Sequence, residues 1–348
     1  MQTMNTYIRT SLAVCRLLLL SLCLSFLASC LQEEDGMKED GMCDVTVSLS
    51  VAPYEAAGNT KTRAYVNGNH DENLVNGFWI FQYNADTGQI IGEPGYRLAG
   101  NDLNNLDIKF TQNAAGEKSV ICFIANTGDD KWITDANKAE FDTYEKLRQH
   151  IMADAATKAF DSQHLGPIGG TGPNGETGLR SIPMCGVSKP TVIASKTYVS
   201  IPLVRMFARM TIDINGSYIS DENIKIKNLT LRNIPSYCRV STLEQQDLSQ
   251  PAIYPDITWT DYDAKEAGKI TIYMPENLQG KVPGMTAKKD AKAKLFPAKA
   301  FKVDLTMIDN GTEKKYTLYP GLDMVNDFNI RRNHIYNVNI KINKTTTE

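Results

Sequence analysis

Short segments in which apolar and polar residues alternate dominate this sequence, and they constrain its fold more than any other feature. In residues 45–51 the alternation has no interruption, and one face would carry Val45, Val47, Leu49 and Val51. A period of two is typical of a β-strand with one buried face. Comparable strands are predicted at 78–83, 120–125, 206–214, 224–231, 270–274, 301–307 and 336–342. Many short strands predict antiparallel β-sandwiches and an all-β fold.

The remaining segments refine this organisation. Within 224–231 the alternation slips near Asn228, and only residues 139–159 have helical spacing. A chain of 348 residues exceeds what one hydrophobic core usually organises, which predicts two domains. We expect an N-terminal domain at 45–190 and a C-terminal domain at 191–348, with the boundary within 186–198, where Ser188-Lys189-Pro190 interrupts the strand patterns.

The first thirty residues have the features of an export signal. Arg9 and Arg16 precede an apolar run at 17–27 that is too short to span a bilayer, so residues 1–29 are predicted to be a signal peptide. Leu27-Ala28-Ser29-Cys30 resembles the lipobox of bacterial lipoproteins, which would make Cys30 the lipid-bearing first residue of the mature protein. The alternative is a plain signal peptide with a chance cysteine at its exit.

Residues 30–44 form an acidic, glycine-containing tether with no apolar periodicity. Beside a lipidated cysteine, this acidic cluster resembles the surface-export signal of Bacteroides-type lipoproteins. That resemblance predicts a surface-exposed protein held to the cell outer membrane by its lipid. The alternative is a spacer without a sorting role.

No catalytic motif emerges from the sequence. The four histidines lack metal-ligand spacing, the glycine-rich segment 166–178 lacks the Gly-Lys-Ser/Thr ending of a phosphate loop, and no G-x-S-x-G turn occurs. We therefore expect no catalytic residues, no metal and no cofactor. A net charge of −3 implies no nucleic-acid partner, and the basic run 288–294 is interpreted as a solvated loop.

The cysteines give no zinc or disulfide framework. Cys122 lies in an apolar run and is interpreted as a small buried hydrophobe. A disulfide among Cys43, Cys185 and Cys238 is compatible with an exported protein, but the sequence does not assign one.

An ordered series of short segments resembles the fimbrillin family, the pilus subunits and adhesins of Bacteroides-type bacteria. These segments are 61–64, 71–75, 78–83, 124–127, 182–186, 204–209, 273–280, 326–328 and 330–336. The resemblance implies two transthyretin-like β-sandwich domains and a structural role in a fimbria that supports adhesion. It also implies other fimbrial subunits and a trypsin-like maturation protease as partners. The receptor is not implied.

In the family, the protease removes an N-terminal segment after an arginine, and a strand from a neighbouring subunit fills the gap. Here the cut would fall between Arg63 and Ala64, and it would expel the strand 45–51. A sandwich that lacks a strand exposes an apolar groove and unpaired backbone groups, which favours capture of another extended segment.

The candidate donor strand is the alternating C-terminal segment with Tyr336, Val338, Ile340 and Ile342. Its alternative role is an ordinary edge strand of the second domain. Only residues 343–348 follow it in this sequence. A shaft subunit, a tip subunit that accepts without donating, and an uncut membrane anchor therefore all remain open.

A surface glycan-binding lipoprotein is the alternative function. It would use Trp79, Trp132 or Trp259 as stacking platforms, although Trp79 lies in an apolar run typical of a core and the other two are expected to be exposed.

Arg205 and Arg209 are interpreted as ion-pairing residues at a domain edge. A surface hydrolase would require two carboxylates that converge in a deep cleft.

Overall fold

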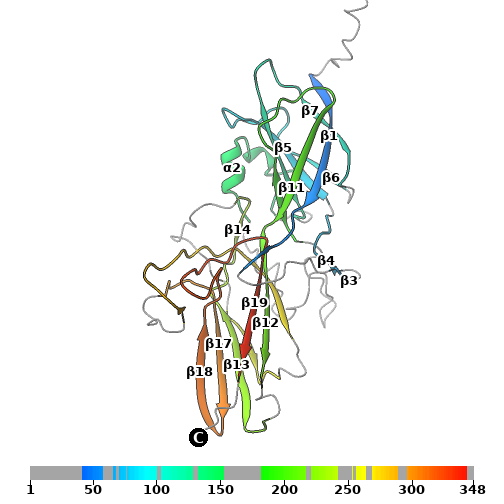
Figure 1. Cartoon of the computed structure of the whole chain (residues 1–348). Helices are drawn as coiled ribbons and strands as arrows, with labels where there is room; N and C mark the ends of the chain where they lie inside the picture. Colours follow the sequence, from blue (N-terminus) through cyan, green and yellow to red (C-terminus); the bar gives the residue numbers. More distant parts are fainter. Residues whose placement is uncertain are drawn as a thin grey trace, which may run out of the picture.

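The computed structural model is an elongated β-protein in which two β-rich parts follow one another along the long axis (Figure 1). The structure describes residues 41–57, 66–67, 70–75, 77–99, 103–127, 132–152, 182–216, 221–241, 253, 256–263, 269–288 and 296–342. Several predicted features lie outside these ranges, namely the signal peptide 1–29, Cys30, most of the tether, and the cleavage-site residues Arg63 and Ala64. Within these ranges, no helix is long and apolar enough to cross a membrane.

The N-terminal part is built on one seven-stranded sheet. In spatial order its strands are β6 (Tyr96–Ala99), β5 (Gly77–Asn84), β8 (Ser119–Ala125), β10 (Met184–Val187), β11 (Thr197–Arg205), β1 (Met42–Val51) and β7 (Leu106–Thr111). Apolar side chains of β1, β5, β7, β8, β10 and β11 belong to one buried cluster, so the sheet curves back over itself. The side-chain amide of Gln82 on β5 reaches β7, where it donates to Thr111 O at 2.7 Å and accepts from Thr111 N at 3.0 Å.

The outer face of β5 and β8 carries a second apolar cluster. It is covered by short elements, namely η1 (Lys138–Glu140), α2 (Tyr144–Gln149) and the pair β9 (Ile151–Met152) with β14 (Cys238–Arg239). The helix predicted over 139–159 is thus reduced to α2 within the described residues, because the chain turns into β9 directly after it. The Thr143 side chain caps α2 by accepting from Lys146 N at 3.2 Å.

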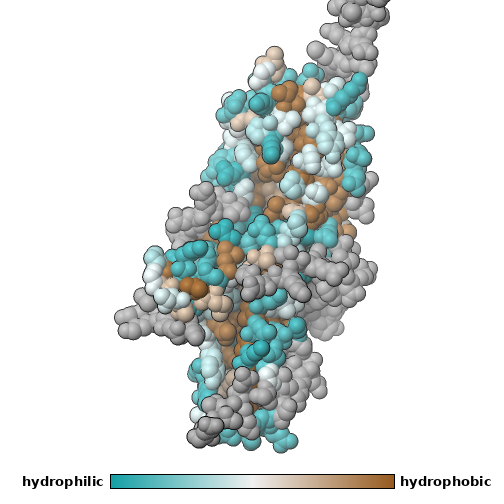
Figure 2. All heavy atoms as spheres, viewed as in Figure 1, coloured by the Kyte–Doolittle hydropathy of each residue, from teal (hydrophilic) through white to brown (hydrophobic). Residues whose placement is uncertain are grey.

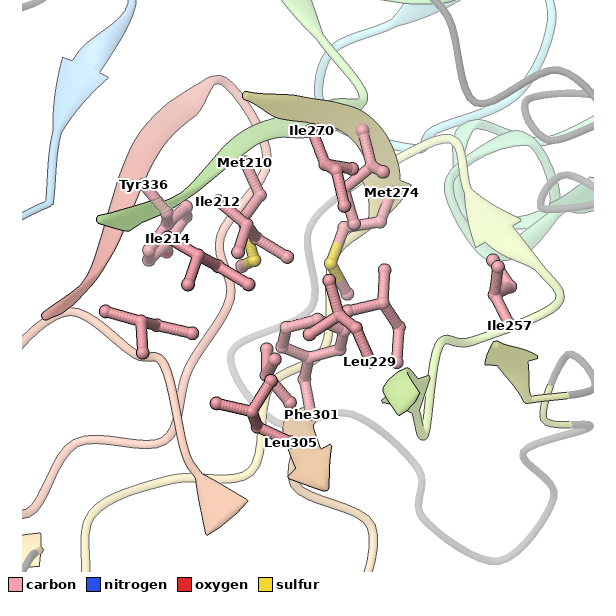
Figure 3. Close-up of a cluster of buried hydrophobic side chains, with 14 of the residues drawn as sticks. Met210, Ile212, Ile214, Leu229, Ile257, Ile270, Met274, Phe301, Leu305 and Tyr336 are labelled. Atoms are coloured by element: carbon pink, nitrogen blue, oxygen red, sulfur yellow. The ribbon is translucent and has the colours of Figure 1, made fainter. Parts of the chain in front are cut away.

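The C-terminal part is a sandwich of two four-stranded sheets. One contains β16 (Ile270–Pro275), β12 (Phe207–Asn215), β19 (His334–Lys341) and β2 (Glu55–Ala56) in that order. The other contains β15 (Ile257–Thr260), β13 (Ile224–Arg232), β17 (Lys302–Asp309) and β18 (Thr312–Leu318). Their inner faces enclose a large apolar cluster that includes Met210, Leu229 and Phe301 (Figure 3). A further small pair joins β3 (Val66–Asn67) and β4 (His70–Asp71).

The fold confirms the predicted all-β class and several of its details. Val45, Val47 and Leu49 are buried, and the register of β13 against β17 shifts between Ile226 and Asn228, where the sequence indicated a slip. The sheets are not purely antiparallel, because β1 pairs with β11, β12 with β19, and β19 with β2 in parallel.

The chain passes from the N-terminal sheet to the C-terminal sandwich at Met206. β11 pairs with β1 and β10, whereas β12 pairs with β16 and β19. We propose Met206 as the domain boundary, later in the chain than the range 186–198, because the break at Pro190 is a connection between two strands of one sheet.

Candidate assembly site

β1 occupies an interior position in the N-terminal sheet. It pairs in parallel with β11 from Val45↔Thr197 to Val51↔Leu203 and antiparallel with β7 from Met42↔Thr111 to Val47↔Leu106. Both of its backbone edges are therefore used. Its inward side chains, Cys43, Val45, Val47 and Leu49, are buried, and Val51 is half-buried. Among the described strands, β7 pairs only with β1.

The segment after β1 continues into the C-terminal sandwich. Ala52 N donates to Leu203 O at 2.8 Å, and Glu55 N donates to Asn333 O at 2.9 Å. β2 then pairs in parallel with the start of β19, and Ala57 N donates to Ile335 O at 3.1 Å. A single segment, 42–57, is thus hydrogen-bonded to both parts of the molecule. We call it the leader segment.

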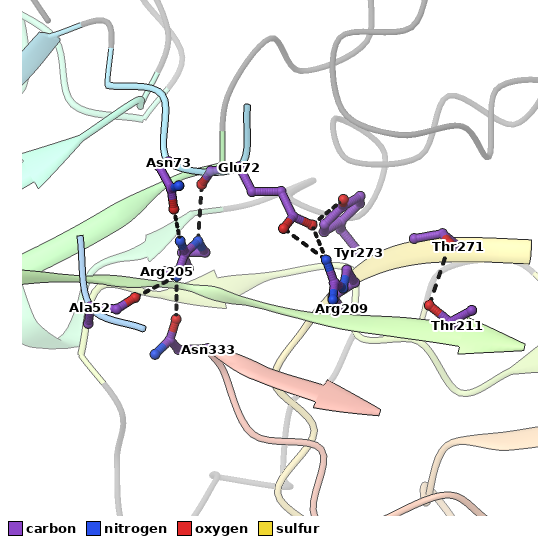
Figure 4. Close-up of polar contacts among 9 residues, drawn as sticks. All are labelled: Ala52, Glu72, Asn73, Arg205, Arg209, Thr211, Thr271, Tyr273 and Asn333. Carbon is purple, nitrogen blue, oxygen red and sulfur yellow. Dashed lines mark hydrogen bonds and ion pairs between the residues drawn. The ribbon is translucent and has the colours of Figure 1, made fainter. Parts of the chain in front are cut away.

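Arg205 holds the leader segment where the two parts meet (Figure 4). Its side chain is only 1% exposed, and its Nη1 donates to Ala52 O at 2.7 Å and to Asn333 Oδ1 at 2.9 Å. Its Nε donates to Glu72 O at 3.0 Å, and its Nη2 donates to Asn73 Oδ1. A buried guanidinium is stable only when its donors are satisfied in this way.

The aromatic ring of Tyr54 fills the space beside two arginines. The ring centroid lies 4.1 Å from Arg205 Cζ and 5.2 Å from Arg209 Cζ, and the side chain is 4% exposed. Burial, reinforced by the nearby Glu72 carboxylate, raises the pKa of Tyr54, so its phenol stays neutral. A neutral ring against two guanidinium groups is a favourable cation–π arrangement.

Glu72 connects these arginines to β16. Its carboxylate accepts from Arg209 Nη1 at 2.9 and 3.1 Å, and it also accepts from the Tyr273 hydroxyl at 2.5 Å (Figure 4). Burial and the Glu72 carboxylate both raise the pKa of Tyr273, which keeps that hydroxyl a donor. The predicted ion pairing of Arg209 at the junction is therefore present, with Glu72 as its partner.

β19, which carries the candidate donor residues, is part of the sandwich core. Tyr336 and Ile340 are buried, and Val338 and Ile342 are half-buried. The Tyr336 hydroxyl accepts from Arg331 N at 2.7 Å and donates to Asn329 O at 3.2 Å. One edge of β19 pairs with β12 along its length, from Ile335 to Lys341. On the other edge, the described pairing with β2 stops at Ile335.

A groove of about 660 Å³ follows this second edge of β19. It is bounded by Ala57 of the leader segment, by Tyr336–Asn339 and by the loop Pro320–Met324. Met324 and Val325 are exposed apolar side chains in this loop and the residue after it. Figure 2 shows that apolar and polar surface are interspersed on the visible face of the molecule.

At Lys288 the interpretation of the basic run 288–294 as a solvated loop is wrong, whereas residues 289–294 lie outside the described residues. Its side chain is buried, and its Nζ donates to three backbone carbonyls, Tyr319 O at 3.0 Å, Asp323 O at 2.7 Å and Asp327 O at 2.5 Å. Burial lowers the pKa of Lys288 to about 8, although the Asp323 and Asp327 carboxylates oppose that shift. Lys288 therefore stabilises the loop that borders the groove through these hydrogen bonds. The charged residues around it in sequence give no indication of this role.

The tryptophans provide little support for a glycan platform. Trp79 is buried, as predicted, but Trp132 is also buried, against the expectation that it is exposed. Trp132 O accepts from Asn137 Nδ2 at 3.0 Å, and its ring belongs to the cluster on the outer face of β5 and β8. Trp259 is half-buried against the core of the C-terminal sandwich.

The four cysteines of the described chain are free thiols. Cys122 is fully packed, as predicted, and burial raises its pKa well above the ordinary value. Cys43 and Cys238 are also buried and Cys185 is half-buried. Among the described residues, no three His, Cys, Asp or Glu side chains gather as a metal site.

The sequence interpretation missed Tyr54 and the connection made by Arg205. One signal was available, because the alternation of 45–51 ends at Ala52-Pro53 and an aromatic residue follows at once. A proline cannot donate to a strand ladder, so a change of environment is expected at that point.

Comparisons with known proteins place the fold. A family model described as a domain of unknown function (DUF4906) matches residues 272–340, which run from β16 to β19. No curated protein sequence matches the chain. Among solved structures, the C-terminally truncated tip fimbrial protein Mfa3 from Porphyromonas gingivalis aligns over 88% of this chain and 96% of its own, with a TM-score of 0.53 and 12% identity.

A candidate cell adhesion protein from Parabacteroides distasonis aligns over 87% of this chain and 89% of its own. Its TM-score is also 0.53, and its sequence identity is 13%. Similarity at this level of identity concerns the fold. In agreement with the fimbrillin resemblance of the sequence, this chain has the all-β sandwich fold of these fimbrial and cell adhesion proteins.

Proposed function

We propose that this chain is a structural subunit of a cell-surface fimbria, assembled by protease-triggered strand complementation, and that it supports adhesion. The observation that carries the proposal is the position of β1. This strand lies between β11 and β7 and is hydrogen-bonded to both. It precedes the predicted cleavage site at Arg63, whereas both of its partners follow that site. A cut between Arg63 and Ala64 would free β1 and β2 together without breaking any later strand.

The vacancy left by β1 would strongly favour a replacement. Its departure leaves one edge of β11 and one edge of β7 without strand partners and uncovers the apolar interior that Val45, Val47 and Leu49 fill. An incoming strand with four large aliphatic side chains would gain roughly 6–12 kcal/mol from burial, before the cost of ordering it. Because donor and acceptor surfaces differ, repeated capture produces an open filament.

The cell surface is the proposed location. In this proposal, residues 1–29 direct export and Cys30 carries the lipid. The acidic tether is predicted over 30–44, but β1 begins at Met42, so the residues before Met42 hold the folded part away from the cell outer membrane. A trypsin-like protease and other fimbrial subunits are the partners.

We further infer that this subunit accepts a strand more readily than it donates β19. To donate Tyr336–Ile342, the chain would have to lift the buried Tyr336 and Ile340 out of the sandwich and break the ladder with β12. Exposure of those two side chains alone costs roughly 3–6 kcal/mol. A subunit at the fimbrial tip accepts a strand into the vacancy left by β1 and donates none. The cost of releasing β19 therefore favours a tip position.

Surface fractions of cells that express the wild type and Arg63→Ala test the proposal. We expect the wild type to begin at Ala64 by N-terminal sequencing and to enter high-mass assemblies, whereas Arg63→Ala should remain lipidated at Cys30 and outside them. Lys61→Ala provides a matched control, because it removes a nearby basic residue and should be processed normally. Equal incorporation of the wild type and Arg63→Ala would contradict the cleavage step.

A further inference from the structure

Arg205 and Arg209, the two guanidinium groups packed against the Tyr54 ring, both follow Arg63 in the chain. Arg205, Arg209, Glu72 and Asn333 all remain when the leader segment leaves, and hydrogen bonds join Arg205 to Asn333 and Arg209 to Glu72. Arg209 is fixed by the Glu72 carboxylate, and Arg205 by Glu72 O and Asn333 Oδ1. The two guanidinium groups therefore keep their places independently of the ring.

The same residues also bind the backbone of the leader segment. Arg205 Nη1 donates to Ala52 O, and Asn333 Nδ2 donates to Pro53 O, both at 2.7 Å. Two consecutive carbonyls are thus bound by side chains immediately before the residue whose ring enters the pocket. This pattern recognises an extended segment at one defined point along its length.

Such a point solves a physical problem for strand capture. In a ladder of alternating apolar and polar residues, a shift by two residues returns the same side chains to the same face. The β1 ladder with β11 and β7 therefore sets the face of an incoming strand but only weakly sets its register. A single aromatic anchor outside the ladder would remove that ambiguity.

We propose that the junction pocket formed by Arg205, Arg209 and Asn333 is a register-setting site, which receives an aromatic side chain from the strand of a neighbouring subunit that replaces the leader segment. This inference rests on the proposed function and specifies the chemistry of the partner. The partner segment carries alternating apolar residues for the β1 position and a Phe, Tyr or Trp at the end that reaches the C-terminal sandwich. Lysine and arginine at that position are rejected by the two guanidinium groups.

A peptide-binding experiment tests the inference on the otherwise intact chain. Residues 59–62 are replaced by the recognition sequence of a protease that does not cut after arginine, so that trimming is independent of Arg63. The trimmed protein, separated from its leader segment, is titrated with a fluorescent peptide of residues 42–57 as the probe. All variants are made in the peptide, so the folding of the receiving protein is the same throughout.

We expect the wild-type, Tyr54→Phe and Tyr54→Trp peptides to bind within about threefold of one another. Tyr54→Leu should bind at least fivefold more weakly, and Tyr54→Ala and Tyr54→Lys at least tenfold more weakly. Ser50→Ala, at an exposed position of β1, is the matched control and should bind like the wild type.

The outcomes separate the two proposals. If the wild-type peptide fails to bind the trimmed protein, the proposed strand complementation fails. If it binds, and Tyr54→Ala or Tyr54→Leu binds equally well, the ladder alone carries recognition and the junction pocket has no register-setting role.

Discussion

Arg205 Cζ lies 4.1 Å from the ring centroid of Tyr54, and the same guanidinium donates to the carbonyl of Ala52 two residues earlier. One side chain thus contacts the leader segment through both its backbone and its aromatic ring. Because Arg205 is the last residue of β11 and also binds Asn333, it ties the leader segment to both parts of the protein at once.

Arg205→Lys should lower the free energy of unfolding by about 2–4 kcal/mol, because a lysine keeps the charge but loses most of the fixed donors. Urea denaturation followed by circular dichroism measures the change. Arg148→Lys is the matched control, since Arg148 is partly exposed, and its guanidinium pairs with Glu145 and lies over the ring of Tyr144, both on α2. It should change stability by less than about 0.5 kcal/mol, and equal effects of the two substitutions would contradict a special role for Arg205.

Leu49→Ala should loosen β1 by removing buried contacts with the interior of the N-terminal sheet. The expected loss is about 2–5 kcal/mol in the stability of that sheet. Hydrogen exchange by mass spectrometry would report it as faster exchange in both β1 and β7, because β7 pairs with β1. Ser50→Ala, on the exposed side of β1, should leave both strands protected, and an unchanged β7 in Leu49→Ala would refute the coupling.

Lys288 should give the chain a characteristic pH dependence. Its pKa is about 8 in the folded chain, chiefly because of burial, and near 10.5 when unfolded, so between these values the unfolded state holds a proton that the folded state has released. Stability contributed by this group therefore rises with pH across that window. The unfolding free energy of the wild type minus that of Lys288→Met should increase from pH 7.5 to 9.5 in urea titrations.

Lys281→Met is the control for that measurement, because Lys281 is an exposed lysine close to the same loop. Its pH profile should stay parallel to that of the wild type. A wild-type minus Lys288→Met difference that is flat or falls with pH would contradict the burial of Lys288.

A covalent lock on β19 would test whether this strand is donated. Thr211 and Asn337 are register partners on β12 and β19, so Thr211→Cys combined with Asn337→Cys should form a disulfide across the pair. We expect the oxidised double variant to enter assemblies as well as the same variant kept reduced. Loss of assembly on oxidation, restored by reductant, would instead identify β19 as the donor strand.

The periodic parts of the fold could be predicted from the sequence, because a buried strand face leaves a local pattern. The inward residues of β1 and the register shift near Asn228 follow from that pattern alone. The parallel pairing of β1 with β11 joins segments about 150 residues apart, and nothing local encodes which strands become neighbours. For the same reason β11 reads as the start of a second domain although it belongs to the first sheet.

The residues at the junction were harder to predict, because their roles depend on partners that are remote in sequence. Arg205 meets Ala52, Glu72 and Asn333, and no spacing rule connects these positions. Lys288 has lysine neighbours in the sequence and nevertheless points into a ring of carbonyls. Trp132 follows two aspartates and a lysine, yet it packs into an apolar cluster.

The pairing of β7 with β1 has a kinetic consequence for the proposed exchange. β1 is the strand partner of β7 in the described sheet, so an intermediate without β1 would leave β7 held by side-chain contacts such as those of Gln82. A route through this empty intermediate would therefore meet a high barrier. In a stepwise displacement, the incoming strand pairs with β11 residue by residue while β1 dissociates. This route keeps most of the hydrogen bonds of the sheet intact throughout. After cleavage the leader segment would then stay bound in the sheet, although it is no longer covalently attached. Exchange would begin only when the strand of the next subunit arrives.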